Sequence, residues 1–460
     1  MTQADSFFDA VIVGGGVYGI LLALEGAARG QCVLLVERDD FGAAATFNHL
    51  RTIHGGLRYL QFLDIRRAIT SNRQRLWWLR NFPDLVHPIS CLMPLYGQGM
   101  RRPEAFHGAF LMARTLGLHR DGQGRPGRMA VVSTAEVMQL LPDCRPEGLN
   151  KGALWQDALM PKPHRVIAEL LHWTEDAGAV VHNRMEFVSA TRKGERAWHV
   201  TLRDHRADAQ INVAAKWLVN AAGAGTDEVV RRMTGSVRTP VLVPTMGWGA
   251  LIDRSPISKC SVAVAPPGKG QRTYFVHPYH GRVLAGTGHA GVIPGEPPPT
   301  GVTEAQLSET LHDLNAALPG ARFRREEVQH VFWGVLPGVC PGSDALLMHP
   351  EIIDHGHRDG APGAYTVLGV KFTEAPFVAH RVWNMLLGRG KQQLPPRPPP
   401  VKVPTIDEVR RLSDSALRAE LETLAMTEWK AGIEDVIWRR TDLWLDSKQT
   451  ARVSRLLGDQ

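Results

Sequence analysis

The sequence predicts an α/β fold that begins with a Rossmann-like dinucleotide-binding domain. Two observations predict it: the apolar residues 8–13 run directly into the pattern Gly14-x-Gly16-x-x-Gly19, and a helical pattern then leads to a second apolar run that ends at Glu37. The composition agrees, because 44% hydrophobic and 22% charged residues are typical of a chain with a sizeable core. At roughly 150 residues per domain, 460 residues predict two or three domains.

Each glycine of the pattern has a mechanical role. Gly14 makes the tight turn, Gly16 lets the backbone approach a pyrophosphate, and Gly19 allows close packing of the helix on the strand. The helix N-terminus offers unpaired N–H groups to the phosphates, and Glu37 stands where a carboxylate accepts ribose hydroxyls. The pattern fits both FAD and NAD. A single copy near the N-terminus, with no second copy downstream, favours a permanently held FAD.

The net charge and the cysteine content limit which partners and which cellular compartment are expected. The 53 Lys and Arg against 46 Asp and Glu give a net charge of +7, which fits anionic substrates, an acidic membrane face or nucleic acid. We find no zinc-finger or RNA-recognition pattern, so no nucleic-acid partner is expected. Five scattered cysteines favour a reducing cytosol, and the acidic residues among 1–9 disfavour a signal peptide. The apolar stretch 10–24 is shorter than the ~20 residues of a membrane span, so a soluble or peripheral protein is expected.

Four further segments carry a family resemblance. Residues 53–60, IHGGLRYL, closely resemble the flavin-contacting loop of the FAD-dependent, respiratory type of glycerol-3-phosphate dehydrogenase, in the D-amino-acid-oxidase-like flavoprotein group. Residues 220–223, 366–373 and 428–445 are similar to that family's strand-end turn, last flavin-binding turn and helical C-terminal domain. The resemblance spans nearly the whole chain, with a shortened C-terminal domain.

The resemblance implies FAD as the cofactor and a set of residues that contact it. His54 is expected to position the flavin through its backbone, and Thr373 either opens a helix that faces the flavin or simply caps that helix, which is worth about 1 kcal/mol. The implied cofactor contacts are Thr46, Ile53, His54, Gly55, Ala222, Gly223, Gly369, Phe372 and Thr373, with Val188 near the adenine.

Arg58 and Lys371 match family positions that face the substrate. Oxidation of a secondary alcohol by hydride transfer needs a base for the hydroxyl proton and cations for any phosphate, which arginine binds with two parallel hydrogen bonds. Arg58 could instead form a surface ion pair, and Lys371 could hydrogen-bond the flavin alone. The pairs His277–His280 and His355–His357 lack nearby acidic clusters, so no metal site is expected.

Several substrate positions depart from the family. Leu336 stands where the family has an arginine, and Gly249 aligns with the family's candidate histidine base. Arg324 and Arg325 could replace the lost arginine. His289, in the changed sequence after Gly286-Thr287, could be a relocated base.

The resemblance also implies the domain organisation. Residues 1–80, 150–240 and 335–392 would form the FAD-binding domain, and residues 81–149 and 241–334 an antiparallel-sheet substrate domain. A stiff proline-rich linker, 393–404, would lead to a small C-terminal helical domain, 405–460, of two or three helices.

Three functions remain open. The first is oxidation of glycerol-3-phosphate, or a close relative, to the ketone, with electrons passed to quinone. The second is oxidation of another polyol, hydroxy acid or amine, and the third is flavin binding without turnover. The expected location is the cytoplasm, with peripheral attachment to the inner membrane as the alternative. Residues 66–80 follow a helical pattern rich in Arg and Trp, which fits a membrane surface or an ordinary amphipathic core helix.

Overall fold

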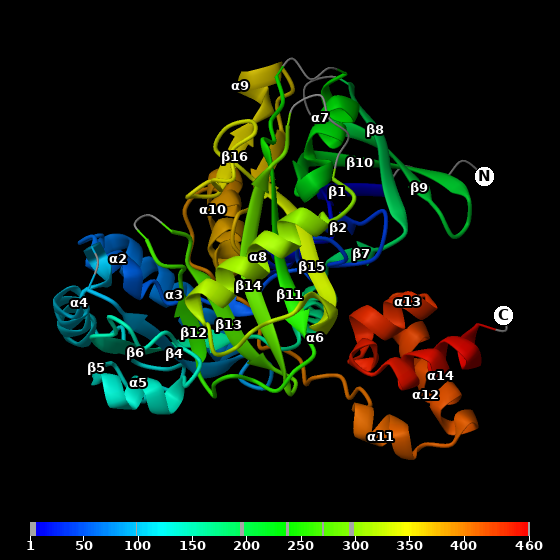
Figure 1. Cartoon of the computed structure of the whole chain (residues 1–460). Coiled ribbons are helices and arrows are strands. Elements are labelled where there is room, and N and C mark those ends of the chain that lie inside the picture. Colours follow the sequence, from blue (N-terminus) through cyan, green and yellow to red (C-terminus); the bar gives the residue numbers. More distant parts are fainter. Residues whose placement is uncertain are drawn as a thin grey trace. The chain divides into compact units, whose positions relative to one another are not determined.

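The computed structural model describes residues 6–97, 99–193, 197–235, 239–268, 271–293 and 299–458 (Figure 1). The chain packs into two compact units. The first comprises Met1–Phe47, Lys162–Pro244 and Leu346–Gln460, and the second comprises Asn48–Pro161 and Thr245–Ala345. Each unit therefore depends on contacts between segments that are far apart in the sequence.

The first unit is built on a mostly parallel sheet, which confirms the predicted Rossmann-like fold. Its central strands follow the order β16-β17-β10-β1-β2-β7, and β9 joins β8 to β10. β1 pairs in parallel with β10 and β2, so that Val13, Val36 and Asn220 end at one edge. All of β2 is buried, as a parallel strand covered on both faces should be. The strands are β1 (Ser6–Val13), β2 (Val33–Val36), β7 (Val180–His182), β8 (Met185–Lys193), β9 (Ala197–Asp204), β10 (Ala209–Asn220), β16 (Glu351–Asp354) and β17 (Ala364–Leu368).

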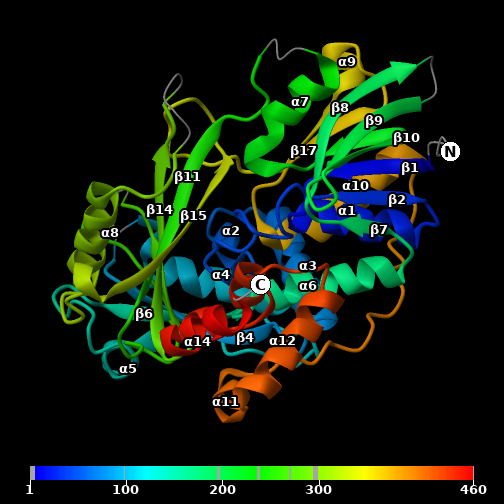
Figure 2. The ribbon, with the colours of Figure 1, turned by 90° about the vertical axis from the view of Figure 1, so that its right-hand side faces the viewer.

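Helix α1 is the structural centre of this unit. It packs against α6 and α10, and Figure 2 shows α1 and α10 beside β1 and β2. Gly26 makes the α10 contact possible, because a Cβ there would lie 2.2 Å from the Trp383 ring, and the Trp383 indole N–H donates to the Leu22 carbonyl at 2.8 Å. The helices are α1 (Val17–Ala28), α6 (Pro163–Asp176), α7 (Thr226–Thr234), α9 (His355–Asp359) and α10 (Ala375–Leu387), with short 3-10 turns η2 (Gly223–Gly225) and η4 (Phe372–Glu374).

The C-terminal helices also belong to the first unit. Within the described residues they number four, more than the two or three predicted, because two are too short to show a helical period. They are α11 (Ile406–Arg411), α12 (Asp414–Thr427), α13 (Ile433–Asp435) and α14 (Ser447–Leu457), with the turns η5 (Val436–Arg440) and η6 (Leu443–Leu445). The proline-rich segment before them is anchored, since the Trp173 indole N–H donates to the Pro395 carbonyl at 3.0 Å.

The second unit contains a largely antiparallel sheet, as predicted for the substrate domain. Its order is β15-β11-β14-β13-β12-β4-β6-β3, with β5 paired to β6, and the β12–β4 pair is parallel. The strands are β3 (Thr52–Ile53), β4 (His87–Leu95), β5 (Ala130–Ser133), β6 (Lys151–Leu159), β11 (Pro244–Ile252), β12 (Ser261–Val264), β13 (Tyr274–Tyr279), β14 (Arg282–Gly291) and β15 (Val328–Pro337).

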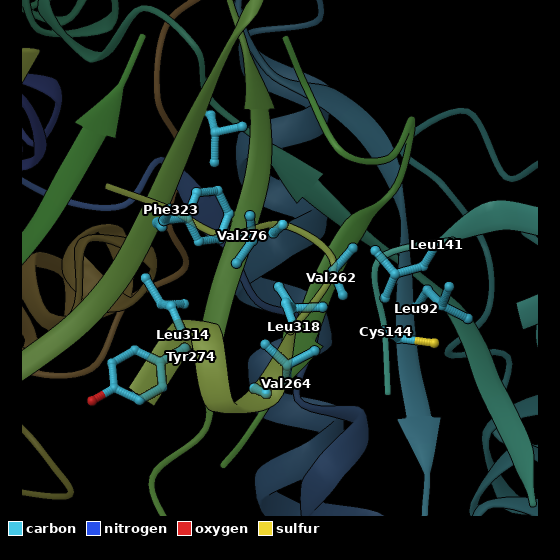
Figure 3. Close-up of a cluster of buried hydrophobic side chains, with 14 of the residues drawn as sticks. Leu92, Leu141, Cys144, Val262, Val264, Tyr274, Val276, Leu314, Leu318 and Phe323 are labelled. Atoms are coloured by element: carbon cyan, nitrogen blue, oxygen red, sulfur yellow. The ribbon is translucent and has the colours of Figure 1, made fainter. Parts of the chain in front are cut away.

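Helices cover this second sheet and bury its core. Leu314 of α8 and Leu318, which follows that helix, lie in one buried cluster with Val262 of β12 and Val276 of β13 (Figure 3). A second cluster includes Phe106 and Phe110 of the fourth helix. The helices are α2 (Leu57–Gln61), α3 (Ile65–Asn81), α4 (Pro103–Thr115), α5 (Thr134–Leu140) and α8 (Glu304–Ala317), with the 3-10 turns η1 (Gly99–Arg101) and η3 (Arg325–Glu327).

Helix α3 is an ordinary core helix, not a membrane-surface helix. Trp78 and Arg75 are buried to within 1%, and the Trp77 ring packs against Trp78 and Phe82. Of the two interpretations of residues 66–80, the burial of Trp78 and Arg75 favours the amphipathic core helix over a helix whose Trp residues lie in a membrane surface. In the described part of the chain, no helix combines the length and apolarity needed to cross a membrane.

The predicted domain boundaries divide the chain by the expected cofactor and substrate contacts, and they stay predictions. By packing alone, residues 48–80 belong to the second unit, because β3 pairs with β6 and α2 packs against α4. The C-terminal helices pack within the first unit rather than apart from it.

Candidate active site

The turn at residues 14–19 joins β1 to α1. At Gly14 and Gly19 it lies so close to neighbouring backbone that no side chain would fit. A Cβ at Gly14 would lie 2.6 Å from the Ala221 carbonyl oxygen, and one at Gly19 would lie 1.9 Å from the Gly14 carbonyl oxygen. Gly14 also has a φ of +111°, which other residues rarely adopt. At Gly16, by contrast, the contact found in the described chain is Thr46 Oγ1, 3.1 Å from the added Cβ. Apart from this one close contact, no described atom beyond those of Gly16 and its chain neighbours lies within 4 Å of that Cβ, so a diphosphate could approach the Gly16 backbone from its other sides.

Glu37 follows β2 and turns its carboxylate toward this glycine turn. Its Oε2 accepts a hydrogen bond from the Gly15 N–H at 2.7 Å, and its Oε1 accepts one from the Asp39 N–H at 2.9 Å. Burial raises the pKa of Glu37, although both backbone hydrogen bonds oppose that rise. Each carboxylate oxygen keeps a second lone pair, so Glu37 can still accept hydrogen bonds from two ribose hydroxyls.

Thr46 supports the first turn of α1. Its Oγ1 accepts a hydrogen bond from the Val17 N–H at 3.1 Å, while Gly16, which precedes the helix, has no side chain to cap it. The other N–H groups of the first turn and the positive end of the helix dipole lie at the Gly16 end of α1. This arrangement suits the binding of a pyrophosphate.

Asn220 holds the strand-end turn that contains the predicted residues Ala222 and Gly223. Its Oδ1 accepts from the Ala222 N–H at 3.0 Å, and its Nδ2 donates to the Thr226 carbonyl at 3.1 Å. The close approach of Gly14 to Ala221 places this turn directly against the glycine turn. The sequence-predicted residues of β1 and β10 are thus brought together.

The turn at residues 369–373 lies beside the start of α1. A Cβ at Gly369 would lie 2.1 Å from the Tyr18 ring, and the Tyr18 hydroxyl donates to the Lys371 carbonyl at 2.7 Å across 353 positions of sequence. Burial raises the pKa of Tyr18 well above its usual value, so the hydroxyl stays protonated and remains a donor. The N-terminal and C-terminal parts of the predicted cofactor site therefore meet. Sequence reasoning missed Tyr18, which joins them.

Lys371 and Thr373 take up different positions in this turn. Lys371 Nζ lies 3.2 Å from Glu374 Oε1, with 38% of the lysine side chain exposed. Thr373 is buried in the 3-10 turn η4, and α10 begins only at Ala375. The prediction that Thr373 opens this helix is wrong by two residues, because Pro376 favours the first turn of a helix and sets where α10 starts. Phe372 lies in the same short turn.

Val188 lies on β8, which starts beside Glu37. The Met185 N–H donates to the Glu37 carbonyl at 2.8 Å, and the Glu37 N–H donates to the His182 carbonyl at 2.8 Å. Val188 follows three residues later, at a register shift between β8 and β9. This place in the fold agrees with a contact near the adenosine, which stays a prediction.

In the second unit, β6 supports the loop that carries His54. His54 Nδ1 lies 3.1 Å from Asp157 Oδ2, and the Gly55 N–H donates to Asp157 Oδ1 at 2.8 Å. Asp157 is buried, whereas 47% of the His54 side chain is exposed. Ile53, the neighbouring predicted contact, is buried in β3 opposite Ala158. The fold therefore presents the imidazole of His54 on a fixed carboxylate.

This contact orients His54 as a proton acceptor. A carboxylate bound to Nδ1 favours the tautomer that carries its proton there and leaves Nε2 with a lone pair. Burial alone would raise the pKa of Asp157, but the His54 hydrogen bond and the nearby Arg75 charge hold it below its usual value. Sequence reasoning missed Asp157, which no local pattern marks, and gave His54 only a backbone role.

Arg58 lies exposed on α2, near a second guanidinium group. The pKa of Arg58 is lowered by partial burial of its charged end and by the like charge of Arg101. Arg101 Nη2 donates to the Gln271 carbonyl and to Thr273 Oγ1, both at 3.0 Å. An anion placed near both arginines would relieve their repulsion. Arg101 was not singled out from the sequence, because its neighbours come from distant segments.

His289 lies on β14, close to the substituted position Leu336. A Cβ at Gly247 would lie 3.2 Å from both His289 Cδ2 and Leu336 Cδ1. Burial, aided by the charge of Arg272, lowers the pKa of His289 to about 4. A general base works best when its pKa is near the working pH, which argues against His289. The geometry favours His54, because Asp157 holds its Nδ1 and 47% of its side chain is exposed.

Leu50 lies against Gly249, the position that the family resemblance aligns with a histidine. A Cβ at Gly249 would lie 2.4 Å from Leu50 Cδ2. A histidine side chain at position 249 would therefore collide with Leu50, and this chain fills the space with an apolar group.

Arg324 and Arg325 form surface ion pairs. Arg325 Nε lies 2.6 Å from Glu304 Oε1, and Arg324 Nη2 lies 3.6 Å from Glu327 Oε1. Both arginine side chains are at least half exposed. The hypothesis that they replace the arginine lost at Leu336 is therefore not supported by their contacts.

A glycine turn, a ribose-type carboxylate and a helix N-terminus on a parallel sheet are the features of a dinucleotide-binding protein. The family model described as FAD dependent oxidoreductase matches residues 9–383. The chain belongs to this family, and FAD is its cofactor. The cradle fits FAD, because Gly16 leaves space for the diphosphate and Glu37 offers free lone pairs for the ribose.

Relatives and solved structures agree with this family. The chain is 25% identical over 412 residues to the glycerol-3-phosphate dehydrogenase of Synechocystis sp., with 85% of this chain and 72% of that protein covered. Its fold resembles the FAD complex of glycerol-3-phosphate dehydrogenase from Bacillus halodurans, with a TM-score of 0.63, 18% identity and coverage of 93% and 73%. It also resembles glycine oxidase from Geobacillus kaustophilus, with a TM-score of 0.56, 17% identity and coverage of 84% and 96%.

Proposed function

We propose that the protein oxidises glycerol-3-phosphate, or a closely related phosphorylated secondary alcohol, to the ketone. The observation that carries this proposal is the contact of His54 with Asp157 of β6, together with the position of Arg58 on α2, four residues after His54. An oriented base and a cation for phosphate are two groups that this reaction needs. The relatives named glycerol-3-phosphate dehydrogenase support the choice of substrate.

His54 is the proposed proton acceptor. Its Nε2 takes the proton of the substrate hydroxyl, while Asp157 holds Nδ1 and stabilises the imidazolium that forms. FAD, when bound, is the two-electron acceptor for the hydride that leaves the substrate carbon bearing this hydroxyl. His289 stays a second candidate for the base, and its burial beside Leu336 argues against it.

Arg58 and Arg101 are the proposed phosphate contacts in the second unit. Burial and the like charge of Arg101 lower the pKa of Arg58, so an anion near both guanidinium groups would be stabilised. Lys371, whose Nζ lies 3.2 Å from Glu374 Oε1, is a separate proposed cationic contact. Arg58 and Arg101 would supply positive charge that the leucine at position 336 does not.

A second candidate function follows from the two substituted positions. Leu336 and Leu50 place apolar groups where the family resemblance implies an arginine and a histidine. A pocket changed in this way could take another polyol, a hydroxy acid or an amine, and the fold is shared with a glycine oxidase. Loss of turnover, with FAD retained, is the third reading.

We also propose that electrons pass to quinone at a membrane surface. The support is an exposed apolar turn between α2 and α3, where Phe62, Leu63 and Ile65 are 64%, 72% and 42% exposed. Leu111, on the adjacent helix α4, is 66% exposed. Exposed Arg66 adds positive charge beside these residues, a composition that suits an anionic lipid surface.

Anaerobic mixing of the FAD-loaded protein with a panel of substrates tests the proposed reaction. Glycerol-3-phosphate should bleach the flavin absorbance, whereas glycerol at the same concentration should not. Bleaching by a hydroxy acid or an amine alone would favour the second function. A flavin that no member of the panel bleaches would favour binding without turnover.

A pair of arginine variants sharpens this test. Arg58→Gln should raise the concentration of glycerol-3-phosphate needed for half-maximal bleaching by about 10- to 100-fold, the effect of losing a charged hydrogen bond. Arg66→Gln changes an exposed arginine of the neighbouring helix and serves as the matched control. Equal effects of both variants would contradict a phosphate contact at Arg58.

A further inference from the structure

Buried charges join two stretches of the first unit that are about 400 positions apart in sequence. Asp40 is 1% exposed. Its Oδ1 accepts hydrogen bonds from Arg440 Nη2 at 2.7 Å and Asn183 Nδ2 at 2.8 Å, and its Oδ2 accepts from Arg440 Nη1 at 2.9 Å and Arg439 Nε at 2.8 Å. Burial alone would raise the pKa of Asp40, but the Arg440 and Arg439 charges lower it to about 2. The carboxylate is thus an anchor for the C-terminal segment.

The C-terminal segment is itself braced by further buried carboxylates. Glu428 is fully buried, and each of its two carboxylate oxygens accepts a hydrogen bond from Arg165 Nη1 at 3.0 Å. Arg440 Nε lies 3.3 Å from Glu428 Oε2. Asp435 accepts from Arg184 Nη2 at 2.8 Å. Both arginines that bind Asp40 also contact a second carboxylate: Arg439 contacts Asp435, and Arg440 contacts Glu428. These shared contacts hold the C-terminal segment in one orientation.

Aromatic contacts reinforce both ends of the loop that follows Glu37. The Trp429 ring meets the edge of Phe41, with ring centroids 5.8 Å apart. At the other end, Phe47 packs against Trp438 and Trp444, with centroids 6.4 and 6.0 Å apart. We call the loop of residues 38–47 the ribose loop and the segment of residues 428–445 the C-terminal clamp.

The ribose loop touches the cofactor cradle along its length. It begins after Glu37 and contains Thr46, which supports the first turn of α1. The Gly42 N–H donates to the Gly15 carbonyl at 2.9 Å, and Phe41 Cδ1 lies 2.5 Å from where a Cβ of Gly15 would be. Movement of the ribose loop would therefore displace both the Glu37 carboxylate, which accepts from the Asp39 N–H, and the glycine turn of residues 14–19.

We propose that the C-terminal clamp retains FAD by holding the ribose loop against the cradle. Trp438, Arg439 and Arg440 act through the loop and are positioning residues rather than cofactor contacts. The proposal depends on FAD as the cofactor and not on which alcohol or amine is oxidised. Failure of the substrate test would leave it intact.

Hydrogen exchange on the full-length protein tests this coupling without any substitution. Coupling between two sites is reciprocal, so bound FAD should slow amide exchange in residues 428–445 by about tenfold relative to the FAD-free protein. Helix α11, which contributes nothing to the clamp, is the internal reference. Exchange in residues 428–445 that FAD leaves unchanged would overturn the proposal.

Two variants measure retention directly. Arg439→Gln and Trp438→Leu should each speed FAD release from the holoprotein by about tenfold, followed as rising flavin fluorescence after dilution. Arg452→Gln is the matched control, because Arg452 joins the C-terminal helices through Asp414 and the Leu412 carbonyl and does not reach the ribose loop. If the clamp variants release FAD no faster than Arg452→Gln, the clamp is a purely structural element and the proposal fails.

Discussion

Asp157 is a residue whose contacts depend on the fold and not on its neighbours in the sequence. It lies in a strand among Trp155, Ala158 and other apolar neighbours, and nothing in that pattern marks it as functional. Pairing of β3 with β6 places its carboxylate on His54 and on the Gly55 N–H. Catalytic geometry that depends on such a pairing cannot be read from local spacing.

We predict that removing either member of this pair slows flavin bleaching. His54→Gln should lower the anaerobic bleaching rate by about 10² to 10⁴-fold, the usual contribution of a general base. Asp157→Asn should lower the bleaching rate by a smaller factor, because a neutral amide still holds the imidazole but stabilises the imidazolium less than a carboxylate does.

His289→Asn separates the two candidate bases. It should leave the bleaching rate near that of the parent protein, because burial keeps the pKa of His289 at about 4, far from the working pH. Rates are compared per FAD-loaded molecule, so that cofactor loss is not mistaken for slow chemistry. A large effect at His289 together with none at His54 would reverse the assignment.

At the scale of elements, the sequence predicted local structure well. The strand, glycine turn, helix and second strand of residues 6–36 form because each is specified by neighbouring residues. The start of α10 was misplaced by two residues, since Pro376 outweighed Thr373. The sequence left open whether the aromatic residues of α3 face a membrane or the core, because a helical period shows that one face is apolar but not what covers it.

The turn between α2 and α3 carries the membrane prediction instead. We expect the protein to sediment with vesicles that contain anionic lipid, and Phe62→Ser with Leu63→Ser to weaken that binding, since each removes apolar area from the lipid contact. Met426→Ser, at another exposed apolar residue, is the matched control. Sedimentation of both variants to the same extent would rule out this turn as the membrane contact.

At the scale of the whole chain, the cofactor site is assembled from segments that return to one sheet. Residues near positions 14, 37, 222 and 370 meet because β1, β2 and β10 end at one edge and Tyr18 reaches Lys371. The family resemblance, not the spacing, predicted that meeting. The changes at Leu336 and Gly249 were visible in the sequence, but only the structure shows that Leu50 fills the space.

The most direct measurement is the rate of anaerobic flavin bleaching by glycerol-3-phosphate deuterated at carbon 2. If the substrate transfers hydride from that carbon, we predict bleaching by the ordinary substrate and bleaching several-fold slower with the deuterated one. Absence of bleaching, or equal rates with the two substrates when bond cleavage limits the reaction, would contradict oxidation of this alcohol.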